Sequence, residues 1–353
     1  MTFEQARAEF PVLEHTAYLN AGSCGPLARG TVSAMETEQS RDLERGRGGA
    51  VFIDRILELR QALRERLAEL VSAAPEHVAL TSSTTDGCNI VVAGLGLTAN
   101  DEVITTTDEH FGLIGPLHAS GARVVVVPPD VERIAAAVTP RTKLVALSQV
   151  LWTTGQVLPV RALRETTGLP ILVDGAQSVG AMPVEAEGLD FLTISGQKWL
   201  CGPDPSGGVV VADPERLRVA RPSYSSQQAH EADGTFTPWP GARRFEPTWL
   251  STGSLAGLLA ALDFRPSWRF EHAQETAERL RARLAEAGRE VVVPERRATL
   301  VSWRVDGAEP ATVVERLADA GVIVRELPGT GLVRASVGWW TSDGDLERLL
   351  ASL

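Results

Sequence analysis

The sequence predicts an α/β protein, with a large domain built on a mostly parallel seven-stranded sheet and a smaller α+β domain after it. Short, β-branched, nearly all-apolar runs recur between residues 77 and 212, which is typical of strands covered on both faces. Several of these runs are separated by helix-sized segments, the pattern of parallel strands joined by crossover helices. From residue 268 onward, a long helical segment is followed by alternating strands and helices.

The periodicity of the first part of the chain predicts its elements in order. Residues 53–73 place apolar side chains at helical spacing and predict an amphipathic helix. Residues 77–82 predict a short strand, and residues 85–96 predict a helix that ends in glycine. Further strands are expected over 101–106, 123–128, 143–150, 170–177, 190–195 and 207–212, and helices over 131–138 and 159–168.

The stretch 221–250 differs from what precedes it, because it is rich in Pro, Ser, Gln, Trp and Gly and has little periodicity. We expect a long loop there, over a site or at a subunit contact. A helix is expected again over 253–264, and the boundary between the domains near "FRPSW", residues 264–268. The expected units are an N-terminal segment over 1–16 that packs with the small domain, a large domain over 17–264 and a small domain over 265–353.

The composition limits the class of protein. The formal net charge of −11 argues against nucleic acid or an anionic membrane as a partner, and no run of 18 apolar residues occurs. The N-terminus is charged and lacks the apolar core of a secretion signal, so we expect a cytoplasmic protein. Cys24, Cys88 and Cys201 are odd in number and widely spaced, which predicts neither a disulfide framework nor a metal site.

Lys198, in "TISGQKWLCGP", lies in an apolar neighbourhood of a chain that has only one other lysine, Lys143. Burial disfavours a charged ammonium and lowers its pKa, and a neutral amine can bond to an aldehyde. The alternative is a lysine whose ammonium group reaches solvent along the protein surface.

Asp174, in "ILVDGAQSVG", follows an apolar strand, where a carboxylate is costly unless it has a positive partner. The protonated nitrogen of a pyridine ring would be such a partner and would make the ring an electron sink. The alternative is a helix N-cap in a strand-to-helix turn. Gln177 follows Asp174 closely and is placed to donate to a ring oxygen.

Two further stretches follow predicted strands. In "LTSSTTDGCN", residues 80–89, a hydroxyl-rich turn opens a helix, and its backbone N–H groups with Thr85 would form a phosphate cradle. In "DEHFGL", residues 108–113, His110 offers a flat ring for stacking. An amine, an acid, a phosphate cradle and a stacking ring at one edge of a sheet together predict pyridoxal 5′-phosphate (PLP) as the cofactor.

The chain resembles the class V aminotransferase family of fold-type I PLP enzymes over essentially its whole length. "VDGAQSVG", "SGQKWLCGP" and "RFEP…STGSLAGLLAAL" are specific in combination. The resemblance implies that Lys198 is the Schiff-base lysine and that Asp174 is the partner of the ring nitrogen. It implies further contacts to the cofactor: Gln177 on the ring hydroxyl, His110 stacked on the ring, and Thr84, Thr85, Ser195 and Gln197 at the phosphate.

The same resemblance implies a substrate site. Arg334, in "LVRASVGWW", matches the arginine that grips the substrate carboxylate, and Trp152 and Asn20 are expected to line the site. The likeness is strongest to the cyst(e)ine C–S lyases, as in "LSQVLWTTGQVLP" around Trp152. Gln197 departs from the more usual histidine, but its amide can still donate a hydrogen bond.

One departure favours a lyase over a cysteine desulfurase. Desulfurases carry a nucleophilic cysteine shortly before the carboxylate-binding arginine, whereas "VIVRELPGTGLVR" contains none. Cys24, in a glycine-rich loop, is expected to be a small buried residue, and Cys88 and Cys201 to be packing residues. We therefore expect β-elimination from cysteine, cystine or an S-substituted cysteine, giving pyruvate, ammonia and a thiol or persulfide.

Three other functions are weighed against this one. An aminotransferase would need a second oxo-acid site, for which Arg325 and Arg243 are candidates. An epimerase would need a second acid or base on the opposite face of the ring, and a scaffold that binds the cofactor without turnover would not need the complete Lys, Asp and Arg set. The resemblance also implies a homodimer with the site at the interface, in which the loop around residues 247–254 would contribute to the phosphate site of the neighbouring subunit.

Overall fold

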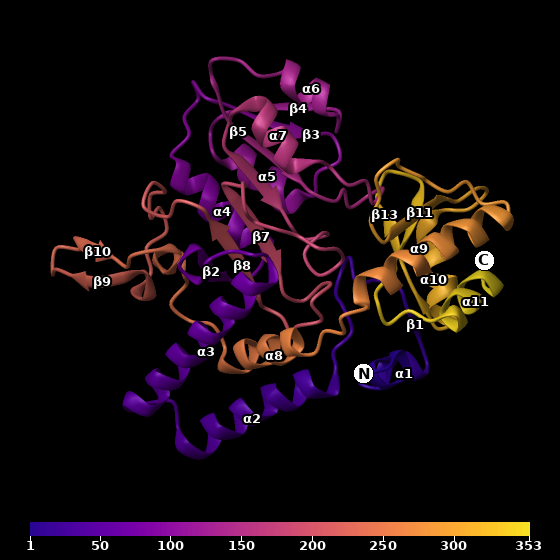
Figure 1. Cartoon of the computed structure of the whole chain (residues 1–353), viewed down its shortest axis with the longest axis horizontal. Coiled ribbons are helices and arrows are strands. Elements are labelled where there is room, and N and C mark those ends of the chain that lie inside the picture. Colours follow the sequence, from indigo (N-terminus) through magenta and orange to yellow (C-terminus); the bar gives the residue numbers. More distant parts are fainter.

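The structure is a computed structural model that describes all 353 residues (Figure 1). A central sheet forms the larger part of the molecule, and a smaller part with its own sheet lies beside it. The long helices α2 (Arg29–Arg45) and α3 (Gly49–Leu70) lie along one side of the larger part together with α8 (Thr252–Asp263). None of the helices combines the length and the apolar character needed to cross a lipid bilayer.

The central sheet has seven strands, and β8 alone runs antiparallel to its neighbours. Each of the seven apolar runs picked out in the sequence forms one of these strands, so the predicted sheet is confirmed. The order across the sheet is β2 (Val78–Thr81), β8 (Gly207–Val211), β7 (Phe191–Ser195), β6 (Ile171–Asp174), β5 (Thr142–Ser148), β3 (Glu102–Thr106) and β4 (Arg123–Val127).

Both faces of this sheet are covered, which explains why its strands are apolar on both sides. Along β5, Leu144 and Ala146 belong to one apolar cluster, and Val145 and Leu147 belong to the other. Helices α3 and α8 pack on one face, while α4 (Thr84–Leu95) and α5 (Phe111–Ala119) pack on the other. The remaining helices of this part are α6 (Val131–Ala136) and α7 (Val160–Thr167).

The smaller part has an antiparallel sheet in which β14 (Leu332–Ser336) lies between β11 (Leu300–Arg304) and β13 (Arg325–Leu327). Its helices are α9 (Arg269–Glu286), α10 (Pro310–Asp319) and α11 (Asp343–Ala351). The N-terminus joins it, because β1 (Ala17–Tyr18) pairs with β12 (Val322–Ile323), and Arg7 of α1 (Phe3–Arg7) bonds Asp345 at 2.7 Å. The division into 1–16, 17–264 and 265–353 as folding units stays a prediction.

Two stretches differ from the expectation. Helix α2 was not foreseen, because its sequence is mostly polar and it buries only a narrow face against α8. The stretch 221–250 is not one loop, since it folds into a hairpin that projects from the body (Figure 1). That stretch comprises β9 (Gln227–His230), β10 (Phe236–Pro238) and the 3-10 turns η3 (Tyr224–Ser226) and η4 (Ala242–Phe245); η1 (Pro11–Glu14) and η2 (Pro75–His77) lie elsewhere.

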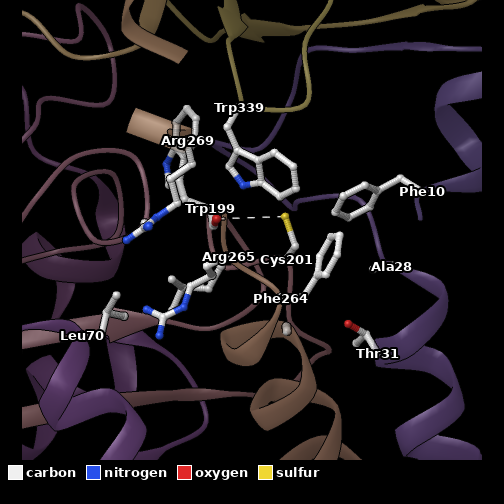
Figure 2. A pocket seen from close by; sticks show the side chains of 13 residues that line it. Phe10, Ala28, Thr31, Leu70, Trp199, Cys201, Phe264, Arg265, Arg269 and Trp339 are labelled. Atoms are coloured by element: carbon white, nitrogen blue, oxygen red, sulfur yellow. Dashed lines mark hydrogen bonds between the residues drawn. The ribbon is translucent and has the colours of Figure 1, made fainter. Parts of the chain in front are cut away.

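Aromatic side chains fill the junction between the two parts (Figure 2). Phe10 packs against Phe264 and Trp339, with ring centroids 6.0 and 5.5 Å apart, and the sulfur of Cys201 lies among these rings. Burial raises the pKa of the Cys201 thiol, so this sulfur stays protonated. Cys201 is thus the packing residue that the sequence predicted, and it sits three residues beyond Lys198 in a tight turn.

Candidate active site

The carboxyl ends of the parallel strands meet at one edge of the central sheet, where open α/β proteins bind ligands. A pocket of about 170 Å³ lies there. Eight of the eleven residues predicted for the site line it, and Ser195, Arg334 and Asn20 do not. The lining residues are Ser83, Thr84, Thr85, His110, Ser148, Trp152, Asp174, Ala176, Gln177, Gln197 and Lys198.

Lys198 projects from a tight turn that follows β7 directly. The turn is fixed by the N–H of Gly202 donating to the carbonyl of Gly196, and by the N–H of Gly25 donating to the carbonyl of Gln197. Burial lowers the pKa of Lys198, and the nearby carboxylate of Asp174 opposes this shift. At a given pH, a larger fraction of Lys198 than of a surface lysine is therefore the neutral amine that can attack an aldehyde.

Asp174 ends β6 and is buried, yet it pairs with no arginine or lysine. Its Oδ1 accepts from the backbone N–H of Ala176 at 2.8 Å, and Oδ2 has no hydrogen bond from the protein. A buried carboxylate that lacks a cation is costly, so the pocket is built for a positive group at this point. The protonated nitrogen of a pyridine ring fits that requirement.

The amide of Gln177 is held in one orientation. Its Oε1 accepts from the indole N–H of Trp199 at 3.0 Å, and its Nε2 donates to the carbonyl of Gly22 at 2.9 Å. An amide nitrogen carries two protons, so the second is left to point into the pocket as a donor. This arrangement suits a ring oxygen beside Asp174.

His110 is the N-cap of α5. Its Nδ1 accepts from the backbone N–H of Gly112 at 3.0 Å, so in the neutral ring Nε2 carries the proton. Burial, followed by the nearby Lys198, lowers the pKa of His110, which keeps the imidazole neutral at pH 7. The ring meets Trp152 edge-on, with centroids 5.3 Å apart. Helix capping and aromatic packing thus fix the plane of the ring.

A hydroxyl-rich turn opens helix α4 on another side of the pocket. Ser83 caps the helix through a bond from the N–H of Asp86 at 3.1 Å, and Thr84 and Thr85 form the first turn. Gln197 faces the same pocket, whereas Ser195 lies behind it and donates its hydroxyl proton to the Gln197 Oε1 at 2.7 Å. Backbone and side-chain donors therefore converge where an anion would bind.

Arg334 is fully buried in β14, outside the residues that line the pocket. Its Nη1 donates to the carbonyl of Trp152 at 2.8 Å, but Nε and Nη2 have no partner. Burial, with a further contribution from Arg325, lowers the pKa of Arg334 to about 9. Two unpaired donors on a buried cation call for an anion, and a carboxylate matches the guanidinium fork.

The loop 20–25 lies against Arg334. A Cβ atom at Gly22 would lie 2.6 Å from Nη2 of Arg334, so any other residue at this position would displace that nitrogen. Asn20 forms a backbone bridge with Ser336, and its Oδ1 accepts from the hydroxyl of Ser23. Asn20 therefore stabilises the conformation of this loop and does not line the pocket.

The structure corrects the expectation for Cys24 and supports that for Cys88. Cys24 is exposed rather than buried, because the loop 20–25 runs over the outside of the turn that carries Lys198. Partial burial and the neighbouring Asp204 raise the pKa of its thiol, which disfavours the reactive thiolate. Cys88 is buried in α4 as a packing residue.

Three lining residues were missed by the sequence reasoning: Ser83, Ser148 and Ala176. Ser148 is the last residue of β5, next to Asp174 in register, and its hydroxyl donates to Glu109 at 2.6 Å. The signal that could have found Ser148 is a polar residue at the carboxyl end of a predicted parallel strand.

With this geometry in place, the comparisons with known proteins place the chain in a family. A model of the aminotransferase class-V family matches residues 21–349, and the chain belongs to that family. Among curated proteins, it is 28% identical to an isopenicillin N epimerase of Streptomyces clavuligerus, over 99% of this chain and 97% of that one. It is also 28% identical to the cysteine desulfurase CsdA of Escherichia coli, over 98% of this chain and 95% of that one.

Solved structures give the same picture. A lysine-to-alanine mutant of C-DES, with glycine covalently linked to its PLP cofactor, superposes with a TM-score of 0.92 at 28% identity and covers 98% of both chains. The complex of the cystine C–S lyase C-DES with its reaction product cysteine persulfide superposes with a TM-score of 0.91, also at 28% identity, over 97% of this chain and 98% of that one. The expected fold is confirmed.

Proposed function

We propose that this protein is a PLP-dependent lyase that breaks the C–S bond of a sulfur-containing amino acid. The observation that carries this proposal is Lys198 facing one pocket with Asp174, a buried carboxylate that forms no salt bridge within the protein. C-DES, the structural relative described above, is a cystine C–S lyase with a PLP cofactor.

The residues present fit PLP. Lys198 would bond to its aldehyde carbon, Asp174 would pair with the ring nitrogen and Gln177 would donate to the ring hydroxyl. His110 would lie on the ring, and Thr84, Thr85 and Gln197 would hold the phosphate, with Ser195 behind them. When bound, the cofactor supplies an electron sink for negative charge that develops at Cα of an amino acid.

Different residues around the cofactor would then bind the substrate, remove its proton and position the surrounding loop. Arg334 would bind the substrate carboxylate through its free Nε and Nη2 and so fix the orientation of Cα. Lys198 would remove the proton from Cα, because its pKa is lowered and its amine faces the pocket. Trp152 would form the wall beside the substrate, and Asn20 would hold the loop that covers Arg334.

The fate of the sulfur separates a lyase from a desulfurase. Arg325 and Arg334 face each other in the β13–β14 hairpin, and the turn between them contains no cysteine. No thiol in this position can take sulfur from the substrate. The sulfur would therefore leave with the product, as a thiol from cysteine conjugates or as a persulfide from cystine, together with pyruvate and ammonia.

The deciding experiment uses the full chain with PLP. The visible absorbance band of the bound cofactor is recorded, cystine, cysteine and an S-alkyl cysteine are added in turn, and pyruvate and thiol or sulfide are assayed in the same tubes. A yellow protein that releases pyruvate supports the lyase. Bleaching without pyruvate would favour an aminotransferase, and loss of optical purity without pyruvate would favour an epimerase, the activity named for one relative. The control is Lys198→Ala, which should bind no covalent cofactor.

We also propose a homodimer whose interface includes residues 247–254. Trp249 is 68% exposed, and with Phe52 and Ile56 it borders a cavity of about 450 Å³ between α3 and this segment. Leu43 and Val51 expose further apolar surface nearby on the helix pair. Sedimentation of the full chain should give twice the mass of 37.8 kDa, and Trp249→Ser should shift it toward the monomer.

We place the protein in the cytoplasm, because all three cysteines are unpaired and two of them are buried where no disulfide partner reaches. Recovery of the protein in an exported fraction would contradict this placement.

A further inference from the structure

A second cavity, of about 380 Å³, lies where the two parts of the molecule join, and it shares no residue with the candidate active site. Its walls come from the end of α3, from the end of α8 and from the first residue of α9. The charged residues that line it are Arg66, Glu69, Asp263, Arg265 and Arg269. Three arginines and two carboxylates therefore face one space, and the cations are in excess.

Both carboxylates of this cavity are engaged by the same arginine. Nη1 of Arg66 contacts Glu69 at 3.1 Å, and its Nη2 contacts Asp263 at 2.8 Å. Arg66 is thereby neutralised within the protein. No carboxylate is left over for the other two arginines.

Arg265 and Arg269 form no salt bridge. Nε of Arg265 donates to the carbonyl of Leu262, and Nη1 of Arg269 donates to the carbonyl of Pro266. The guanidinium of Arg269 lies over the ring of Phe270, 4.0 Å from its centroid, which leaves the edge that carries the N–H groups open. A guanidinium has five N–H donors, so most donors of both residues are available to a ligand.

The two guanidinium groups are held close together and are half-buried. Figure 2 shows both of them on the side of Leu70, which also lines the cavity. Burial lowers the pKa of both arginines; Glu69 opposes the shift of Arg265, whereas Arg265 adds to the shift of Arg269. Two cations that repel each other at the edge of a cavity would be stabilised by an anion between them.

We propose that this cavity binds a phosphate dianion between Arg265 and Arg269, either free phosphate or the monoester of a small metabolite. Guanidinium groups match phosphate oxygens with paired N–H donors, and two unpaired cations match a doubly charged anion. The volume equals that of roughly a dozen water molecules, which leaves room for a group attached to the phosphate. Glu69 and Asp263 would repel a long polyanion, so the site favours a small one.

The position of the cavity gives the ligand a structural effect. Asp263 ends α8 in the large part, Arg269 begins α9 in the small part, and residues 264–268 link them. A phosphate held by Arg265 and Arg269 would fasten the start of α9 to this link. Because the unfolded chain does not form the cavity, bound phosphate would also stabilise the folded protein. This inference goes beyond the proposed lyase activity and does not depend on it.

The test uses the full chain loaded with PLP, so that the hydroxyl-rich turn of α4 is already occupied. Inorganic phosphate and glycerol 3-phosphate are titrated by calorimetry at constant ionic strength and at about pH 8, where phosphate is a dianion. Thermal unfolding is recorded in the same solutions. The proteins are the wild type, Arg265→Gln, Arg269→Gln and, as a matched control for loss of one positive charge, Arg133→Gln on the exposed side of α6.

The wild type should bind phosphate saturably and unfold at a higher temperature in its presence than in chloride of equal ionic strength. Each of Arg265→Gln and Arg269→Gln should weaken binding about tenfold, since each loses charge-assisted bonds. Arg133→Gln should follow the wild type. Tighter binding of glycerol 3-phosphate than of phosphate would identify a monoester as the ligand, and equal binding would identify free phosphate.

Two results would overturn the inference: no saturable binding to the wild type, or affinities in both arginine variants equal to that of the wild type. The visible band of bound PLP in each variant shows that it has folded. If Arg265→Gln does not fold, Arg269→Gln still decides. Failure of the wild type to take up PLP is a different result, because it would remove the proposed function. The difference between the wild type and the arginine variants would then still report on this cavity.

Discussion

Arg334 holds a charge in the interior of the protein with two of its nitrogen donors unused. Such a group is tolerated where a ligand supplies the missing anion, because the ligand then recovers bonds that the fold leaves unmade. The carbonyl of Trp152 fixes one side of the guanidinium and leaves the fork formed by Nε and Nη2 open.

We predict that Arg334→Lys lowers kcat/KM roughly 100- to 1,000-fold, mainly through KM, because an ammonium cannot form the two parallel bonds of the fork. The measurement is steady-state pyruvate release at several substrate concentrations. The matched control is Arg316→Lys on the exposed side of α10, which should leave both constants unchanged. A loss of kcat at constant KM would contradict a role in binding the carboxylate.

Glu109 shows how a neighbour of a site residue can control stability. Its carboxylate accepts from the N–H and hydroxyl of Ser148 and from the hydroxyl of Thr106, and burial raises its pKa from 4.5 to about 7. Between these two values the folded protein keeps a proton that the unfolded chain has lost. The contribution of Glu109 to stability is therefore full below pH 4.5 and is lost as the pH rises to 7, an effect of at most about 3 kcal/mol.

The corresponding prediction concerns Glu109→Gln. From pH 6 to pH 8, the free energy of unfolding should fall by about 1 kcal/mol less in this variant than in the wild type. Urea unfolding at the two pH values measures it, with Glu65→Gln on the exposed face of α3 as the control for loss of a carboxylate. Parallel declines in wild type and Glu109→Gln would show that Glu109 does not keep its proton.

Among the elements, the loop 20–25 connects the two sheets through backbone contacts. It lies on Arg334 at Gly22 and on the turn of Lys198 at Gly25, where a Cβ would approach the carbonyl oxygen of Lys198. These glycines are required by close approach rather than by an unusual backbone angle.

We predict that Gly22→Ala displaces the Arg334 side chain and raises KM by roughly tenfold or more, while the cofactor still binds. The readouts are the visible absorbance band and the kinetics of pyruvate release. Gly30→Ala in α2 is the control, because a Cβ there meets nothing within 4 Å, and it should leave KM unchanged and stability equal or about 1 kcal/mol higher. An unaltered KM in Gly22→Ala would show that the loop yields and Arg334 does not.

The elements also show what sequence reasoning can reach. The seven strands were predictable, because the six strands that are buried on both faces must be apolar and the partly exposed edge strand β4 is rich in valine. Lys198, Asp174 and Gln177 lay in motifs at the ends of these strands. Helix α2 was not predictable from the sequence, because a helix that covers only α8 needs few apolar residues. The position of Ser195 behind Gln197 was also hidden, because which of two neighbouring hydroxyl and amide groups faces a pocket depends on tertiary packing.

At the scale of the whole molecule, one buried carboxylate ties distant segments together. Glu246 is completely buried and bonds Arg60 at 3.1 Å and Arg64 at 2.7 Å, both on α3, and it also accepts from the N–H of Leu80 in β2. This cluster fixes the start of the segment 247–254 to the body of the large part.

We predict that Glu246→Gln lowers the free energy of unfolding by about 3–5 kcal/mol, because it leaves two buried arginines without a counter-charge. Urea unfolding measures this. The control is Glu185→Gln, which removes an exposed partner of Arg161 and should cost less than about 1 kcal/mol. A loss in Glu246→Gln no greater than in the control would mean that the cluster is solvated in the folded state.

The contacts of the N-terminal loop have a consequence for synthesis. The backbone N–H of Ser336 donates to Leu19, and Asn20 bridges to Ser336, so a segment that is translated early closes on a strand that is translated much later. All of the residues that line the pocket precede β14 in the chain. The unpaired donors of Arg334 therefore reach the site only after β14 has been translated, and a chain that stops before β14 would lack them while keeping every residue that lines the pocket.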